Sequence, residues 1–291
     1  MKTFQHQEEN HSSHDVSKEN NSIQREQIFI DRNGNMSPIK KLSIIIPAYN
    51  EENTIAKLLD RVRKVDLINN IEKEIIIIND CSTDNTKKVI LDYSEWHPEL
   101  HLRIEDHKIN QGKGKAIHTG ISMASGEYLL IQDADLEYDP DDYNKLIKPI
   151  LQGLADVVYG SRFIGDNPHR ILFFWHSIGN QMLTFFSNTM TNLNLTDMET
   201  GYKVFRTSVL QKILLKEKRF GFEPEVTSKI AKIPGIRIYE VGVSYYGRTY
   251  EEGKKIGWKD AVRTLYSIIK FGLFDTVIAN PSITCKKSTA E

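Results

Sequence analysis

Residues 128–140 read Tyr128-Leu129-Leu130-Ile131-Gln132-Asp133-Ala134-Asp135-Leu136-Glu137-Tyr138-Asp139-Pro140. An apolar run of strand length ends here in two carboxylates, those of Asp133 and Asp135. Side chains alternate along a strand, so both carboxylates would point to the same side if extended geometry continued through Ala134. Mg²⁺ and Mn²⁺ prefer such oxygen ligands together with substrate phosphate. The stretch therefore predicts either a divalent-cation site or a solvated acidic turn that closes a strand.

Strands and helices alternate along the middle of the chain. Continuous apolar runs predict buried strands, and residues at helical spacing predict helices between them. This alternation predicts an α/β fold with a mostly parallel sheet and helical crossovers. The expected strands are 42–46, 75–78, 101–105, 128–132, 156–160 and 236–243, and the expected helices are 51–64, 84–93, 114–124, 141–151, 171–193 and 258–274.

Composition limits the classes of function. The chain has 291 residues with a net charge of −1, so no global field favours nucleic acid. Cys81 and Cys285 form neither a metal motif nor a disulfide framework, which fits a reducing compartment. The N-terminus lacks the apolar core of a signal peptide, and no apolar run reaches the ~18 residues of a membrane span. We expect a cytoplasmic protein that is soluble or peripheral on a membrane face.

The chain is expected to contain one folded domain. Residues 1–38 are rich in Gln, Glu, Asn, Ser and His and predict a disordered tail, in which only 28–30 has the pattern of a short strand. The folded domain is expected over 39–275, followed by a flexible tail over 276–291.

Polar and acidic residues follow three different predicted strands. Pro47 to Glu51 follow the first, Asp80 follows the second, and Asp133 and Asp135 follow the fourth. Ligands of parallel sheets bind beyond the carboxyl ends of the strands, so these residues predict one shared cleft. The Gly- and Lys-rich segment 110–116 precedes a helix, and is either a phosphate cradle or a flexible helix entry.

Together these motifs resemble the family 2 glycosyltransferases of GT-A fold, in the dolichyl- or polyprenyl-phosphate mannose or glucose synthase-like branch. The resemblance covers about 41–273 and implies a Rossmann-like central sheet flanked by helices, with acceptor-side helices near the C-terminus. The segments that carry it are 46–52 (IPAYNEE), 79–84 (NDCSTD), 110–116 (NQGKGKA), 132–136 (QDADL) and 160–162 (GSR).

The resemblance implies roles for the matching residues on the donor side. Asp133 would contact the sugar nucleotide, and Asp135 would carry Mg²⁺ or Mn²⁺ at the diphosphate. Some relatives have Gln where this chain has Glu137, which is either a further metal ligand or a solvated neighbour. The expected nucleotide-sugar-binding residues are Pro47, Tyr49, Glu51, Asp80, Lys113 and Asp133.

The acceptor side is expected in the second half of the chain. Asp197 is the candidate catalytic base if the acceptor is a hydroxyl, and otherwise a helix cap or an ion-pair partner. The helices over 171–193 and 258–274 have apolar faces, which suit either a membrane surface or packing on the domain. The expected acceptor- or phosphate-binding residues are Arg162, Arg170, Arg248 and Lys254.

The function expected from this resemblance is an inverting, metal-dependent transfer of a hexose from a UDP- or GDP-linked donor to a polyprenyl phosphate. A phosphate acceptor is already deprotonated near neutral pH, so the reaction would need no strong base. Asp133 and Asp135 would then act on the nucleotide-sugar donor. The alternatives are a GT-A enzyme that uses a hydroxyl acceptor, and a non-catalytic nucleotide-sugar-binding protein. The motifs leave the sugar, the nucleotide, the acceptor and the oligomeric state open.

Overall fold

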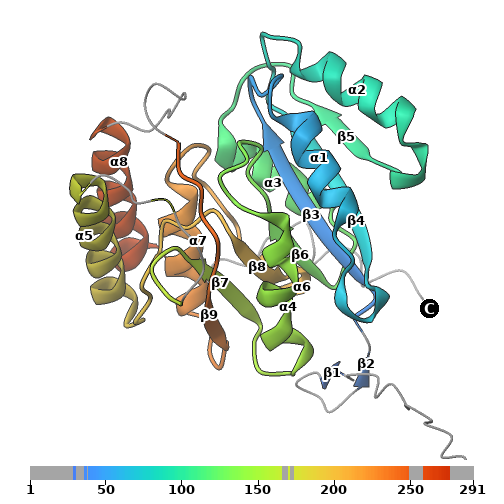
Figure 1. The fold of residues 1–291 in the computed structure, drawn as a ribbon. Helices are drawn as coiled ribbons and strands as arrows, with labels where there is room; N and C mark the ends of the chain where they lie inside the picture. Colours follow the sequence, from blue (N-terminus) through green and yellow to red (C-terminus); the bar gives the residue numbers. More distant parts are fainter. Residues whose placement is uncertain are drawn as a thin grey trace, which may run out of the picture.

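A computed structural model describes residues 29–30, 36–37, 39–165, 170, 174–248 and 258–275. Its centre is a seven-stranded sheet in the order β5-β4-β3-β6-β8-β7-β9 (Figure 1). Its strands are β3 (Lys41–Ala48), β4 (Glu72–Asn79), β5 (Arg103–Asp106), β6 (Tyr128–Ile131), β7 (Val157–Ser161), β8 (Lys203–Arg206) and β9 (Ile238–Gly242). Phe29–Ile30 (β1) pairs with Met36–Ser37 (β2) in a separate two-stranded sheet, and the rest of the two expected tails lies outside the described residues.

Helices cover both faces of the central sheet, as the alternation predicts. Apolar side chains of α1, α2 and α4 pack on one face, and those of α3, α6, α7 and α8 join the core on the other. Ile44 and Ile45 face opposite layers because neighbouring strand residues point to opposite sides. The helices are α1 (Ile55–Lys64), α2 (Thr86–Trp96), α3 (Lys113–Met123), α4 (Tyr143–Leu151), α5 (Phe174–Thr191), α6 (Thr207–Leu210), α7 (Phe222–Ala231) and α8 (Trp258–Ile269).

Short helical turns extend several of these elements. The 3₁₀ turn Pro140–Asp142 precedes α4, and the π-helical turn Lys270–Phe274 completes α8. Two further 3₁₀ turns lie at Ile68–Asn70 and Pro98–Leu100. Within the described residues, no helix combines the length and the apolar character that a membrane crossing requires.

The prediction of a mostly parallel sheet is confirmed, but its centre contains an antiparallel strand that the alternation does not reveal. Strand β8 runs antiparallel to both β6 and β7, whereas β5, β4, β3 and β6 are mutually parallel. The alternation missed β8 because it is short and follows the polar segment 196–201 instead of a helix of its own.

Near the cavity described below, one local prediction is wrong and one condition for the placement of the carboxylates is not met. The first helix begins at Ile55 instead of Glu51, because residues 49–54 form a loop. Strand β6 ends at Ile131, so extended geometry does not continue through Ala134, and Leu136 has a left-handed φ of 63°. A turn, and not strand alternation, therefore places Asp133 and Asp135.

Candidate active site

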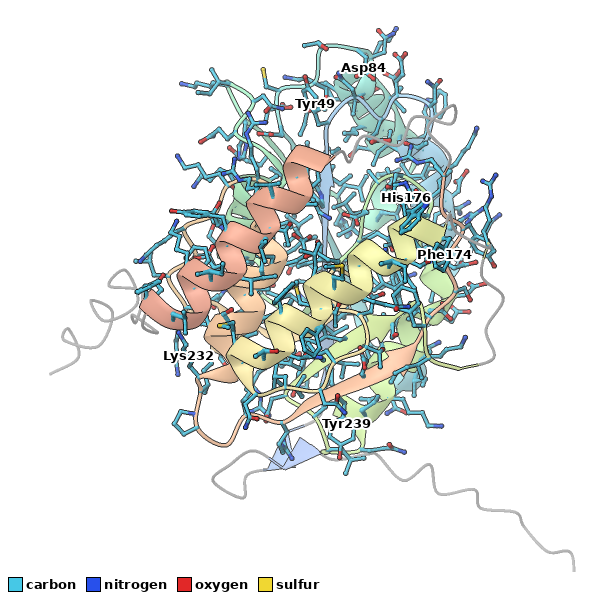
Figure 2. All side chains as sticks on the ribbon, turned by 90° about the vertical axis from the view of Figure 1, so that its left-hand side faces the viewer. Tyr49, Asp84, Phe174, His176, Lys232 and Tyr239 are labelled. Atoms are coloured by element: carbon cyan, nitrogen blue, oxygen red, sulfur yellow. The ribbon has the colours of Figure 1, made fainter. Side chains whose placement is uncertain are left out.

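A cavity of about 390 Å³ lies beyond the carboxyl ends of β3, β4 and β6. Most of the residues singled out from the sequence line it, namely Pro47, Tyr49, Glu51, Asp80, Lys113, Asp133, Asp135, Glu137, Arg162 and Arg248. Arg170 and Asp197 are not among its lining residues, and Lys254 lies outside the described residues. Tyr49 and Asp84 lie at the same end of the molecule, as Figure 2 shows.

The loops after β3 and β4 hold each other in place. The backbone N–H of Asn50 donates to Ser82 Oγ at 3.1 Å, and that of Glu51 donates to Thr86 Oγ1 at 2.7 Å. Asp84 accepts hydrogen bonds from the backbone N–H groups of Glu52 and Thr86. These cross-links fix the walls that carry Tyr49 and Glu51, and they give Asp84 a positioning role.

Asp80 organises the Gly- and Lys-rich segment before α3. Its carboxylate accepts hydrogen bonds from the backbone N–H groups of Gln111 at 2.9 Å and Gly112 at 2.6 Å, and it contacts His107 Nδ1 at 2.6 Å. Gly112 has a φ of +94°, and a Cβ atom there would lie 2.6 Å from the Lys218 carbonyl oxygen. The position therefore requires glycine, and Asp80 supports the cavity wall as well as lining it.

Lys113, the first residue of α3, bridges two cavity carboxylates. Its Nζ lies 2.8 Å from Asp133 Oδ1 and 3.3 Å from Glu223 Oε1 on α7. Burial alone would lower the pKa of Lys113, but Asp133 and Glu223 outweigh burial and raise it. Lys113 is therefore a fixed cation that joins α3, the turn after β6 and α7 at one end of the cavity.

A second charged cluster surrounds Asp135. Arg248 Nη2 donates to Asp135 Oδ2 at 3.0 Å, and the Arg248 backbone N–H donates to Glu137 Oε1 at 2.8 Å. Tyr245 Oη donates to Glu137 Oε2 at 2.8 Å. Burial, Asp133 and Glu137 raise the pKa of Asp135, because they crowd negative charge in a poorly solvated place.

The cluster suits a hard divalent cation that also binds substrate. Asp135 and Glu137 offer carboxylate oxygens, and Arg248 is the cation that pairs with both of them. Among the residues that the structure describes, no group of three or more His, Cys, Asp or Glu side chains is arranged to hold a metal ion. Mg²⁺ commonly takes one or two carboxylates and completes its shell with water and phosphate, which this arrangement allows.

Asp197 is engaged in a buried ion pair. Arg162 Nε donates to Asp197 Oδ2 at 2.6 Å, and Arg162 Nη2 donates to Oδ1 at 2.7 Å. Asn180 of α5 donates to the same Oδ1 at 3.2 Å. Of the roles expected for Asp197, namely catalytic base, helix cap and ion-pair partner, the structure shows the ion pair, which orients Arg162 along the cavity wall.

Arg170 contacts the loop that carries Arg248. Its backbone N–H donates to the Tyr245 carbonyl and its Nη1 to the Gly247 carbonyl, each at 3.0 Å. Arg170 therefore supports the 245–248 loop, and its expected contact with phosphate stays a prediction.

Several cavity residues were not selected from the sequence. They are Tyr138, Glu199, Arg219, Phe220 and Tyr245. Asn110, of the Gly- and Lys-rich segment, and Glu223, which the sequence at 221–225 predicts to face the cleft, line the cavity as well. Glu199 lies two residues before Gly201, where an added Cβ atom would clash with Asp133 Oδ2. The sequence pattern Glu-x-Gly is too common to predict that Gly201 lies against Asp133. The two residues are far apart in the chain, and only the fold brings them together.

Comparisons with known proteins give matches over most of the chain. The family model described as "Glycosyl transferase family 2" matches residues 43–214. A dolichyl-phosphate beta-glucosyltransferase from Trichomonas vaginalis is 31% identical over 81% of this chain and 74% of its own. A dodecaprenyl-phosphate galacturonate synthase from Rhizobium johnstonii is 26% identical over 85% of this chain and 72% of its own.

A solved structure shares the fold. The structure is that of glucosyl-3-phosphoglycerate synthase from Mycobacterium tuberculosis in complex with Mn²⁺, UDP and glucosyl-3-phosphoglycerate. It superimposes with a TM-score of 0.62 at 17% identity and covers 80% of each chain. The expected GT-A architecture is confirmed by this match.

Proposed function

Because the chain is a glycosyltransferase of glycosyl transferase family 2, in its polyprenyl-phosphate sugar synthase branch, we propose a specific reaction. It transfers a hexose from a UDP- or GDP-linked donor to a polyprenyl phosphate, with inversion at the anomeric carbon. The observation that carries this proposal is the cavity itself. It joins an acidic cluster at Asp135 and Glu137 to the guanidinium groups of Arg248 and Arg162. Such a site can hold a diphosphate leaving group and an anionic acceptor together.

The donor would lie along the wall formed by the loops after β3 and β4. Tyr49 and Glu51 line the nucleoside end, and their cross-linked loops need little rearrangement on binding. Mg²⁺ or Mn²⁺ held by Asp135, with Glu137 beside it, would neutralise the charge that develops on the departing nucleoside diphosphate. The UDP and Mn²⁺ of the Mycobacterium tuberculosis structure support this class of donor and cofactor.

The state of Asp197 supports a phosphate acceptor. Its carboxylate is fully buried and held by Arg162 and Asn180, so it is poorly placed to take a proton from a hydroxyl. A phosphate monoester already presents an oxyanion, and Arg162 and Arg248 supply the positive charge that would orient it. The names of the two relatives, which contain dolichyl phosphate and dodecaprenyl phosphate, point to the same acceptor class.

We also propose that residues 39–275 form one catalytic unit, flanked by tails, at the cytoplasmic face of a membrane. Helices α5 and α8 lie side by side on one flank of the molecule (Figures 1 and 2). Exposed aromatic residues at both helices support contact with a lipid interface. They include Phe174, Trp175, Phe185, Tyr266 and Phe274.

A matrix of donors and acceptors tests the proposal. UDP- and GDP-hexoses are incubated with a polyprenyl phosphate, a polyprenol and a soluble glycan, with Mn²⁺, with Mg²⁺ or with EDTA. We expect a glycosyl polyprenyl phosphate of inverted anomeric configuration, identified by mass spectrometry and NMR, and its loss in EDTA. Transfer to hydroxyl acceptors alone would replace this proposal with the hydroxyl-acceptor alternative.

A further inference from the structure

The segment before β8 forms part of the cavity wall and is held firmly. The Gly201 backbone N–H donates to Tyr138 Oη at 2.8 Å, and Asp133 lies so close that a Cβ atom added at Gly201 would clash with its carboxylate. At the other end of the segment, Asp197 is fixed by Arg162. Glu199 lies between these two anchors and lines the cavity. The anchored backbone therefore places the carboxyl group of Glu199 at a defined position in the cavity wall.

One oxygen of this carboxyl group has no hydrogen-bond partner. Glu199 Oε1 is buried and unsatisfied among the described residues. A buried polar atom without a partner is costly, and in native proteins it usually has a partner from water or a ligand. Glu199 therefore retains hydrogen-bonding capacity inside the proposed donor site.

The charged neighbours of Glu199 determine its chemistry. They are Glu223 of α7, Lys203 of β8, Arg162 after β7 and Asp197 of its own segment. Burial and Glu223 raise the pKa of Glu199, while Lys203 and Arg162 oppose this. Lys203 donates to the Thr200 carbonyl and lies 5.1 Å from the centre of the Tyr159 ring, so its ammonium group has other partners. A protonated carboxyl both donates and accepts, as a sugar hydroxyl does.

The order of groups in a nucleotide sugar limits where the hexose can lie. If the nucleoside lies by Tyr49 and the diphosphate by Asp135 and Arg248, the sugar extends along the remaining polar wall. On that wall, Lys113 forms ion pairs with both Asp133 and Glu223. Among the described residues that line the cavity, Glu199 is the carboxyl group with a buried oxygen that lacks a hydrogen-bond partner.

We propose that Glu199 binds a hydroxyl group of the transferred hexose and thereby helps to select the sugar. This inference rests on the proposed function, and it assigns Glu199 to the sugar and not to the nucleotide or the acceptor. It makes Glu199 a specificity-determining residue of the same site.

The test separates sugar binding from nucleotide binding. For wild type, Glu199→Ala and Glu199→Gln, calorimetry gives Kd for UDP, GDP and the UDP- and GDP-hexoses of the panel, and steady-state kinetics give kcat and KM. We expect Glu199→Ala to bind the free nucleotide as wild type does, and to lose about 10- to 100-fold in kcat/KM for the nucleotide hexose. Glu199→Gln keeps a donor and an acceptor, so it should restore most of that loss.

Further comparisons exclude a merely structural effect. A donor that lacks the contacted hydroxyl should react equally poorly with wild type and Glu199→Ala, so a set of monodeoxy donors identifies the hydroxyl. The control Glu95→Ala removes an exposed glutamate of α2 and should change nothing. Unchanged sugar kinetics in Glu199→Ala, or an equal loss of free-nucleotide binding, would overturn the role of Glu199 alone. A wild-type protein that binds no nucleotide sugar would overturn the proposed function and this inference with it.

Discussion

Asp135, Glu137 and Arg248 form the most unusual group of side chains in the cavity. Two carboxylates lie close enough for both to interact with the same guanidinium group, at 3.0 Å from Asp135 and 3.6 Å from Glu137. Arg248 thus supplies within the protein the positive charge that the cluster requires. A divalent cation would have to share these carboxylates with Arg248 or displace it.

Replacing Asp135 should remove metal-dependent turnover and leave the fold intact. Asp135→Asn removes the proposed cation ligand, so we expect turnover with Mn²⁺ to fall by at least about 100-fold. The melting temperature should stay within about 3 °C, because the substitution keeps the side-chain shape. The control is Asp141→Asn, an exposed aspartate just after the same turn. Wild-type turnover in Asp135→Asn would contradict the metal assignment.

Replacing Arg248 should weaken phosphate binding while strengthening metal binding. Arg248→Ala removes a guanidinium that can bind phosphate, so KM for donor or acceptor should rise about tenfold. The same change frees Asp135 and Glu137, so Mn²⁺ should bind more tightly when no nucleotide is present. Titration with Mn²⁺ and steady-state kinetics measure the two effects, with the exposed Arg61→Ala as control. Unchanged KM values for both substrates would exclude Arg248 from phosphate binding.

At the scale of elements, the two edges of the sheet differ in chemistry. The carboxyl ends of the strands carry the cavity, whereas the amino ends are joined by Glu74 of β4. The Glu74 carboxylate accepts hydrogen bonds from the Ser125 N–H and hydroxyl, each at 2.8 Å, and from Ser43 and Arg103. These partners come from β3, β5 and the turn before β6, so Glu74 holds four neighbouring strands together.

The Glu74 network should contribute stability that is lost in acid. Burial alone would raise the pKa of Glu74, but hydrogen bonds from Ser43, Ser125 and Arg103 outweigh it and lower the pKa to about 2. A glutamate in the unfolded chain has a pKa of about 4.3. The stabilisation is therefore complete above about pH 5 and disappears as the pH falls towards 2.

Substitution of Glu74 tests this pH dependence. Glu74→Gln should lower the free energy of unfolding at pH 7 by about 1–3 kcal/mol and flatten its dependence on pH between about 5 and 2. Urea denaturation at several pH values measures both. Glu72→Gln changes an exposed glutamate of the same strand, 65% of whose side chain is accessible, and should have little effect. An acid profile of Glu74→Gln that parallels wild type would contradict the role of the network.

At the scale of the whole molecule, α5 and α8 present an apolar flank. Phe174, Trp175 and Phe274 are 66–79% exposed, which is unusual for large aromatic side chains in water. Arg263 and Lys270 of the same flank both pair with Glu217 at 3.1 Å. We therefore infer that apolar side chains, more than these two cations, would carry the proposed contact with lipid.

Charged substitutions on this flank should weaken membrane binding. We expect the double variant Phe185→Glu and Leu273→Glu to lower partitioning onto lipid vesicles at least about tenfold, because both residues are more than half exposed. Turnover with a short-chain, water-soluble acceptor should be unchanged. Trp96→Glu, on the distant helix α2, is the matched control (Figure 1). Equal vesicle binding by wild type and the double variant would reject this surface.

The sequence by itself determined the fold class, the family and most of the cavity wall. Buried strands are recognised in the sequence as continuous apolar runs. The polar residues that follow them lie close together, because the carboxyl ends of parallel strands are at the same edge of the sheet. Pro47, Tyr49, Asp80, Asp133 and Asp135 could therefore be placed together without coordinates.

Only the tertiary structure decided how the charges are paired. It placed β8 between β6 and β7, paired Asp197 with Arg162, placed Arg248 beside Asp135, and left Glu199 with an unsatisfied oxygen. Periodicity reports how a residue relates to its neighbours in the chain, whereas these interactions join residues up to 113 positions apart. A buried carboxylate can serve as a metal ligand, an ion-pair partner or a hydrogen-bond donor. Its role depends on the charged groups packed around it, and the tertiary structure determines which groups those are.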